Sequence, residues 1–141
     1  MLILRWSRQY VVASREIDDE HRTLFQLAEE LRQALVKDAK ARRLQSITSK
    51  LMAHIAGHFS HEERMMQSMR YPHYEWHKRQ HMVARAAAKR LARKIRLGQA
   101  QAGPELLKFL ESWLKHHIRL SDRMLGAFLR NQERLQQTRQ L

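Results

Sequence analysis

Apolar residues recur at intervals of three and four along most of the chain, and this spacing restricts the fold to packed helices. The first stripe begins at Ile17, and three more follow over residues 44–69, 77–95 and 107–128. Alternating apolar and polar runs, which predict strands, are nearly absent. The sequence therefore predicts an all-α protein.

Helix-breaking residues divide this pattern into four helices. The first is expected over about residues 18–37, and Pro72 ends the second because proline cannot continue the hydrogen-bond ladder. Gly98 closes the third, and Pro104 suits the first turn of the fourth. Four amphipathic helices with short connections predict an up-down-up-down four-helix bundle.

The length of 141 residues fits a single domain with one core. We expect an N-terminal arm over about residues 1–16, the bundle over about 17–130, and a polar C-terminal tail that frays after Arg130. The first residues contain no continuous apolar run of the kind found in signal peptides or membrane spans. A cytoplasmic location is therefore expected.

The chain is strongly basic, with 27 Lys and Arg against 14 Asp and Glu, and a formal net charge of +13. Many of these cations lie on the predicted third helix without an acidic residue between them: Lys78, Arg79, Arg85, Lys89, Arg90, Arg93, Lys94 and Arg96. They form a solvated face, or a face that docks an acidic protein or an anionic membrane surface. Nucleic-acid binding is unlikely, because no recognition module or interleaved aromatic residue is present.

Seven histidines and carboxylates interrupt the helices at similar predicted depth, most of them within the apolar stripes. They are His21, His58, Glu62, His77, His81, His117 and Asp122. A buried polar group without a partner costs about 1 to 3 kcal/mol. Seven polar residues at one depth therefore point to a ligand that they share. The pairs His58/Glu62 and His77/His81 are four residues apart, which places each pair on one helix face.

The composition of this set is typical of a two-metal site. Neutral imidazole suits iron, zinc, copper and nickel, and carboxylates can bridge two cations. The absence of cysteine excludes thiolate zinc and cysteine-ligated iron–sulfur sites. If both carboxylates bridge, three histidines remain for one metal and two for the other. The second metal then keeps an open position for a small ligand.

His117 and Asp122 are five residues apart, a spacing that rotates them about 140° from each other on a regular α-helix. For both to reach the same metals, the helix needs a π-bulge or a bend, or else Asp122 must reach around it. The sequence predicts a local irregularity between these two residues.

Four sequence stretches resemble the hemerythrin family, most of all its single-domain bacterial members, the bacteriohemerythrins. They are Ile17-Asp18-Asp19-Glu20-His21 with Leu24, His58-Phe59-Ser60-His61-Glu62-Glu63 with Met66, Tyr71-Pro72 followed by His77 and His81, and Trp113 with His117-Ile118 and Asp122. Together they cover about residues 6–125.

The resemblance implies a non-heme di-iron centre with a bridging hydroxo or oxo group. His77, His81 and His117 would hold one iron, and His21 and His58 the iron with the open position. Glu62 and Asp122 would bridge both ions.

The implied function is reversible dioxygen binding for oxygen carriage, storage or local supply, and not enzymatic catalysis. Two alternatives stay open: an oxygen-sensing or partner-docking module, and a di-iron enzyme that acts on peroxide or nitric oxide.

Apolar residues next to the ligands are candidates for an oxygen pocket. Phe25, Phe59, Trp113 and Ile118 could form a wall that excludes water, although core packing explains each of them equally well or better. His54 precedes His58 by one helical turn and is an alternative ligand or an outer partner.

Overall fold

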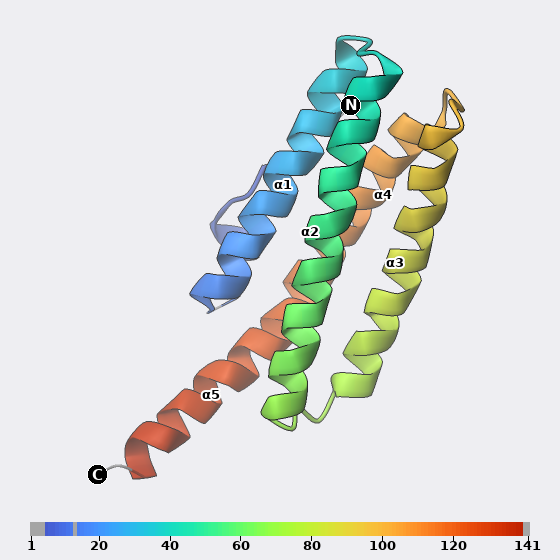
Figure 1. Ribbon diagram of the computed structural model, residues 1–141. Coiled ribbons are helices and arrows are strands. Elements are labelled where there is room, and N and C mark those ends of the chain that lie inside the picture. The colour runs from blue at the N-terminus through green and yellow to red at the C-terminus, as the bar shows by residue number, and fades with distance from the viewer. Residues whose placement is uncertain (1–4, 13, 140–141) are drawn as a thin grey trace.

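The computed structural model describes residues 5–12 and 14–139 and shows an all-helical four-helix bundle (Figure 1). Its elements in chain order are η1 (Arg8–Tyr10), α1 (Arg15–Val36), α2 (Ala41–Ser68), α3 (Tyr74–Arg96), α4 (Ala102–His117), η2 (Ile118–Asp122) and α5 (Arg123–Arg139). The helix α1 packs on α2, α2 on α3 and α3 on α4, and α4 also packs on α1. The predicted fold class is confirmed.

The helix α1 begins three residues before the predicted start because of its N-cap. Ser14 accepts a hydrogen bond from the backbone nitrogen of Ile17 at 3.4 Å, and Glu16 and Asp18 lie in the first turn. Side-chain capping and negative charge both stabilise a helix N-terminus, where backbone N–H groups lack partners. These interactions extend the helix back to Arg15.

The core lies along the predicted apolar stripes. Ile17, Leu31, Ile47, Leu51 and Leu106 are fully buried and come from α1, α2 and α4. The helix α3 faces them with small residues near its middle, Ala84 and Ala88, and ends at Arg96, two residues before Gly98, whose φ is 75°. Burial of these stripes is the main source of stability in a bundle of this kind.

The N-terminal arm packs against the bundle and joins its first and last helices. Tyr10 is buried with its ring centroid 4.8 Å from that of Phe25 on α1. The backbone nitrogen of Val12 donates to Asp18 Oδ1 at 3.0 Å, and the carbonyl of Val12 lies against Gly126 of α5. The arm is therefore part of the packed structure.

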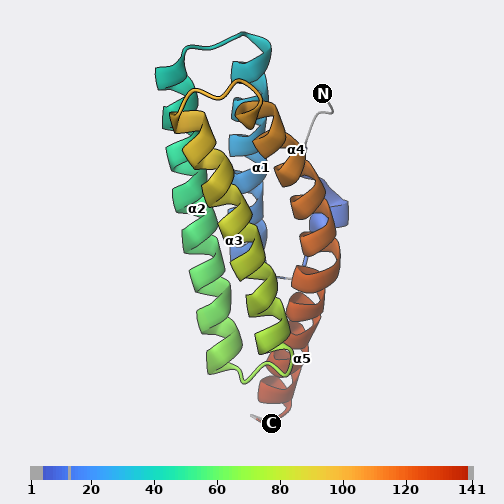
Figure 2. The same ribbon diagram turned by 90° about the vertical axis from the view of Figure 1, so that its right-hand side faces the viewer.

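The fourth helical rod consists of α4, η2 and α5 in continuous succession, and α5 projects beyond the other helices (Figure 2). Residues after Arg130 were expected to fray, but α5 stays helical through Arg139 with mostly exposed side chains. Glutamine, arginine and leucine all have good helix propensity, and packing is confined to the first part of α5, at Leu125, Gly126 and Leu129. Among the described residues, no helix is both long enough and apolar enough to span a bilayer.

Candidate metal centre

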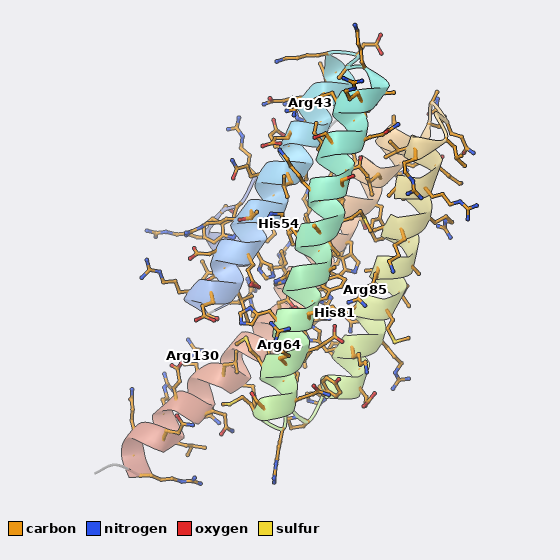
Figure 3. The ribbon with its side chains drawn as sticks, viewed as in Figure 1. Arg43, His54, Arg64, His81, Arg85 and Arg130 are labelled. Carbon is orange, nitrogen blue, oxygen red and sulfur yellow. The ribbon has the colours of Figure 1, made fainter. Side chains whose placement is uncertain are left out.

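The structure brings all seven predicted ligand residues together at the half of the bundle that contains the α2–α3 connection, near His81 in Figure 3. They come from α1 (His21), α2 (His58 and Glu62), α3 (His77 and His81), α4 (His117) and η2 (Asp122). Each is buried, with at most 4% of its surface exposed. Residues distant in sequence therefore form one enclosed polar cluster inside the apolar core.

The predicted irregularity between His117 and Asp122 is a π-helical turn, η2, over Ile118–Asp122. A π turn closes over five residues, so it brings together two side chains at the spacing that an α-helix would separate. His117 Nε2 lies 3.1 Å from Asp122 Oδ1. The π turn thus returns Asp122 to the interior face.

The seven residues form two groups that share both carboxylates. The larger group is Glu62, His77, His81, His117 and Asp122, and the smaller is His21, His58, Glu62 and Asp122. Within each group the possible ligand atoms all lie within 4.8 Å of one another. This division matches the one that the family resemblance implies, with three histidines on one side and two on the other.

Short distances between nitrogen and oxygen atoms define the smaller group. His21 Nε2 lies 3.0 Å from His58 Nε2 and 2.9 Å from Asp122 Oδ2. His58 Nε2 lies 3.4 Å from Glu62 Oε1. These atoms converge on a common centre, as ligands around one cation do.

The donor atoms of the larger group face one another without hydrogen bonds. His77 Nε2 and His81 Nε2 each lie 3.1 Å from a carboxylate oxygen, of Asp122 and Glu62 respectively. Among the described residues, both oxygens of Glu62 and of Asp122, and Nε2 of His77, His81 and His117, lack hydrogen-bond partners. Buried polar atoms in native proteins are normally satisfied, so this set fits cations coordinated between them.

Burial favours the neutral imidazole at two ligand histidines, His81 and His21, whereas Glu62 and Glu20 raise the pKa of His58. Burial, together with the neighbouring His117 and His77, lowers the pKa of His81 to about 2. Burial also lowers the pKa of His21. A neutral imidazole keeps the lone pair that a metal ligand needs.

The two carboxylates affect each other strongly. Burial and the nearby charge of Asp122 raise the pKa of Glu62 well above its usual value. Burial acts in the same direction on Asp122, but its electrostatic interaction with the surrounding histidines, His117 first, outweighs burial and holds the pKa of Asp122 well below its usual value. Two adjacent buried carboxylates do not both ionise without compensating positive charge, which divalent cations would supply.

Three ligand histidines have an outer hydrogen-bond partner that sequence reasoning missed. His58 Nδ1 donates to Glu20 at 2.7 Å, His81 Nδ1 to Glu63 at 3.1 Å, and His117 Nδ1 to Gln80 at 2.9 Å. Such bonds fix the tautomer that presents Nε2 to a metal. A signal was present, because these partners immediately precede or follow the ligand residues His21, Glu62 and His81.

Two of the four residues predicted to form an oxygen pocket lie against histidines of the larger ligand group. Phe59 stacks on His81 with ring centroids 4.0 Å apart, and Trp113 stacks on His117 at 4.3 Å. Phe25 packs on Tyr10 of the arm, and Ile118 is buried in the π turn. The structure thus brings two of the four against ligand rings.

His54 is an exposed residue of α2 and belongs to neither ligand group (Figure 3). His61 is partly buried and hydrogen-bonds Glu20 through Nδ1 at 2.7 Å. The alternative of His54 as a ligand finds no support in this geometry.

Residues 12–129 match the model of the hemerythrin HHE cation binding domain. The chain belongs to the hemerythrin family. It is 26% identical over 112 residues to bacteriohemerythrin of Methylococcus capsulatus, and the aligned region covers 79% of this chain and 85% of that protein. It is 29% identical over 117 residues to myohemerythrin of Sipunculus nudus, with 83% and 86% covered.

Solved hemerythrin structures have the same fold. A crystal structure of a hemerythrin mutant superposes with a TM-score of 0.83 at 23% sequence identity, over 92% of this chain and 98% of that one. Family membership and the buried cluster agree, so this is a metal-binding histidine and carboxylate site of the hemerythrin type.

Proposed function

We propose that this hemerythrin-family chain binds dioxygen reversibly at a di-iron centre and serves oxygen carriage, storage or local supply. The observation that carries the proposal is the unequal division of the cluster. One group offers three histidines and the two shared carboxylates, whereas the other offers only two histidines with the same carboxylates. The metal beside His21 and His58 therefore has one protein ligand fewer.

The donor set supports iron and reversible binding. His77, His81 and His117 would hold one ion, His21 and His58 the other, and Glu62 and Asp122 both. A ferrous pair bound there would supply two electrons to dioxygen, one from each ion. Five neutral imidazoles and only two carboxylates leave such a pair less electron-rich than the carboxylate-dominated sites of ferritin-like proteins, which favours release over oxygen activation.

The surrounding residues would keep water out and hold the ligands still. Phe59 and Ile118 are fully buried, and Phe59 and Trp113 cover the rings of His81 and His117. Glu20 and Glu63 accept the Nδ1 protons of His58 and His81, which keeps each Nε2 directed at the cluster. An enclosed apolar wall of this kind slows the loss of electrons to solvent.

The decisive experiment measures iron content and the visible spectrum of reduced protein. Protein loaded anaerobically with ferrous iron should contain two ions per chain, gain charge-transfer bands when oxygen is admitted, and lose them under an inert gas stream. Immediate irreversible oxidation would contradict reversible binding. Steady consumption of peroxide or nitric oxide without a stable oxygenated form would support the enzyme alternative instead.

Two alanine variants on neighbouring turns of α2 provide a matched comparison. His58→Ala removes a ligand of the smaller group and should reduce the iron content and abolish the oxygenated spectrum. His54→Ala removes an exposed histidine from the same helix and should change neither. Equal effects of the two substitutions would contradict the assigned site.

A further inference from the structure

The positive charge of this chain is unevenly distributed among its helices. The helix α1 carries six carboxylates and three arginines, whereas α3 carries one carboxylate and eight cations. No acidic residue occurs in residues 39–61 or 76–104. The molecule therefore has a strongly basic part, and its acidic residues are concentrated elsewhere.

The two acid-free segments lie side by side, because α2 packs on α3. Their basic ends meet where the α1–α2 and α3–α4 connections lie, at the top of the bundle in Figure 1. The exposed cations there, which we call the basic end, are Lys37, Lys40, Arg42, Arg43, Lys50, Lys89, Arg90, Arg93 and Arg96. The carboxylates closest in sequence to this set are Asp38 in the first connection, Glu29 and Glu30 on α1, and Glu105 in the first turn of α4.

A cavity of about 500 Å³ opens between α2 and α3 within the basic end. Lys89, Arg93 and Arg96 line it from α3, Gln45 and Ser49 line it from α2, and Met52 and Ile95 form part of its largely apolar floor. Cationic and polar donors around a hollow of this size fit phosphate oxygens, which accept hydrogen bonds from arginine in pairs. The chemistry of the hollow suits a phosphate-bearing headgroup.

Two aliphatic side chains project at the same end. Val36 at the end of α1 is 62% exposed, and Leu97 directly after α3 is 67% exposed. Lys37 and Arg96 are their immediate neighbours in sequence. Exposed aliphatic residues flanked by cations are typical of surfaces that lie on anionic bilayers, where the apolar groups enter the headgroup region.

The same surface lacks what a nucleic-acid interface uses. No Phe, Tyr or Trp occurs in residues 37–58 or 77–108, so the basic end offers none of these rings as a platform on which bases could stack. We therefore propose that the basic end docks on a bilayer containing anionic phospholipid, with Val36 and Leu97 entering the headgroup layer. The metal cluster, near the α2–α3 connection, would then lie away from the lipid (Figure 1).

The test is cosedimentation of the full chain with lipid vesicles at low ionic strength. Vesicles of equal parts phosphatidylglycerol and phosphatidylcholine should bind the protein, whereas vesicles of phosphatidylcholine alone should not. Raised salt should weaken binding, because exposed charges are screened. Equal binding to both vesicle types, or none to the anionic vesicles, would overturn the proposal.

Two double variants on α3 distinguish the effect of where the cations lie from the effect of the total charge of the protein. Arg93→Gln with Arg96→Gln removes two cations of the basic end and should lower vesicle affinity about fivefold for each cation. Lys78→Gln with Arg79→Gln removes the same charge from the opposite end of the helix and should leave affinity nearly unchanged. Equal losses would show that total charge, and not the basic end, is responsible.

A third variant and a competitor complete the test. Leu97→Ser should reduce the binding that persists at raised salt, since that part depends on apolar insertion. Circular dichroism of each variant should match that of the parent chain, which shows that the bundle is intact. Displacement of bound protein from vesicles by an equal phosphate concentration of duplex DNA would identify a general polyanion surface and overturn the assignment to lipid.

Discussion

Glu20 connects the buried ligand His58 with the outer surface of the bundle. Its two oxygens accept hydrogen bonds from His58 and His61, both at 2.7 Å. Partial burial raises its pKa, but these two histidines outweigh that effect and hold the pKa of Glu20 below its usual value. Glu20 therefore keeps the charge that orients the His58 ring.

Glu20→Gln should weaken metal binding by the smaller group about 10- to 100-fold and leave the larger group loaded, because an outer partner orients its ligand. Chelator competition followed by metal analysis measures the two affinities. Asp19→Asn is the matched control, since Asp19 is the exposed neighbour of Glu20 on α1 and pairs with Arg22, not with a histidine. Equal weakening by both substitutions would show that the effect is one of general charge.

Gly126 allows the N-terminal arm to approach α5 closely. A Cβ atom at this position would lie 1.5 Å from the carbonyl oxygen of Val12, which is a backbone atom that cannot rotate away. The absence of a side chain is thus a packing requirement at this position.

Gly126→Ala should lower the free energy of unfolding by about 1 to 3 kcal/mol, because the arm must shift or detach. Gly57→Ala should instead raise it by up to about 1 kcal/mol, since alanine is the better helix former and a Cβ there meets nothing within 4 Å. Urea denaturation of the two variants measures both changes. A neutral Gly126→Ala would contradict the close packing of the arm.

At the scale of the elements, the π turn η2 decides which face of the fourth rod carries Asp122. The five-residue spacing from His117 to Asp122 suits a π turn. Such a turn holds one residue more than an α-helical turn, and α4 and α5 continue as regular helices on either side of it.

Inserting one alanine after Leu120 should rotate Asp122 by about 100° and remove the shared carboxylate from both groups. Deleting Leu120, an exposed residue, should convert the turn to a regular α-helix with a spacing of four, which keeps the histidine and the carboxylate on one face. Metal analysis should therefore show loss in the insertion variant and retention in the deletion variant. The reverse order would mean that the π turn does not position Asp122.

At the scale of the whole molecule, folding places two carboxylates and five histidines inside an apolar core. This arrangement is unfavourable without cations, because buried atoms of Glu62 and Asp122 then lack partners. Metal binding and stability are therefore coupled.

Removing metal with a chelator should lower the free energy of unfolding, by about 2.7 kcal/mol for each site that had been held at 100 times its dissociation constant. Glu62→Gln should abolish this metal-dependent gain while leaving the metal-free protein equally or more stable, since an uncharged amide replaces a buried carboxyl group. Urea denaturation with and without chelator measures both effects. Identical midpoints for loaded and metal-free parent protein would contradict the coupling.

Much of the architecture follows from local patterns. Apolar spacing predicted the helices, Pro72 and Gly98 predicted two of the connections, and the spacing of His117 and Asp122 predicted an irregular turn. These features depend on residues close in sequence, whose geometry is set by helix periodicity and backbone sterics. The structure extends α5 to Arg139, and the fraying expected after Arg130 stays a prediction.

By itself, the sequence determined the helices, the identity of the seven polar residues and the need for a distorted turn. Spacing alone could not divide these residues between two metals. The tertiary structure divides them into a group of five and a group of four that share Glu62 and Asp122. It also decided that Glu20 reaches His58 and that Gly126 meets the arm. These features depend on distances between elements far apart in the chain, which helix packing fixes and local periodicity does not.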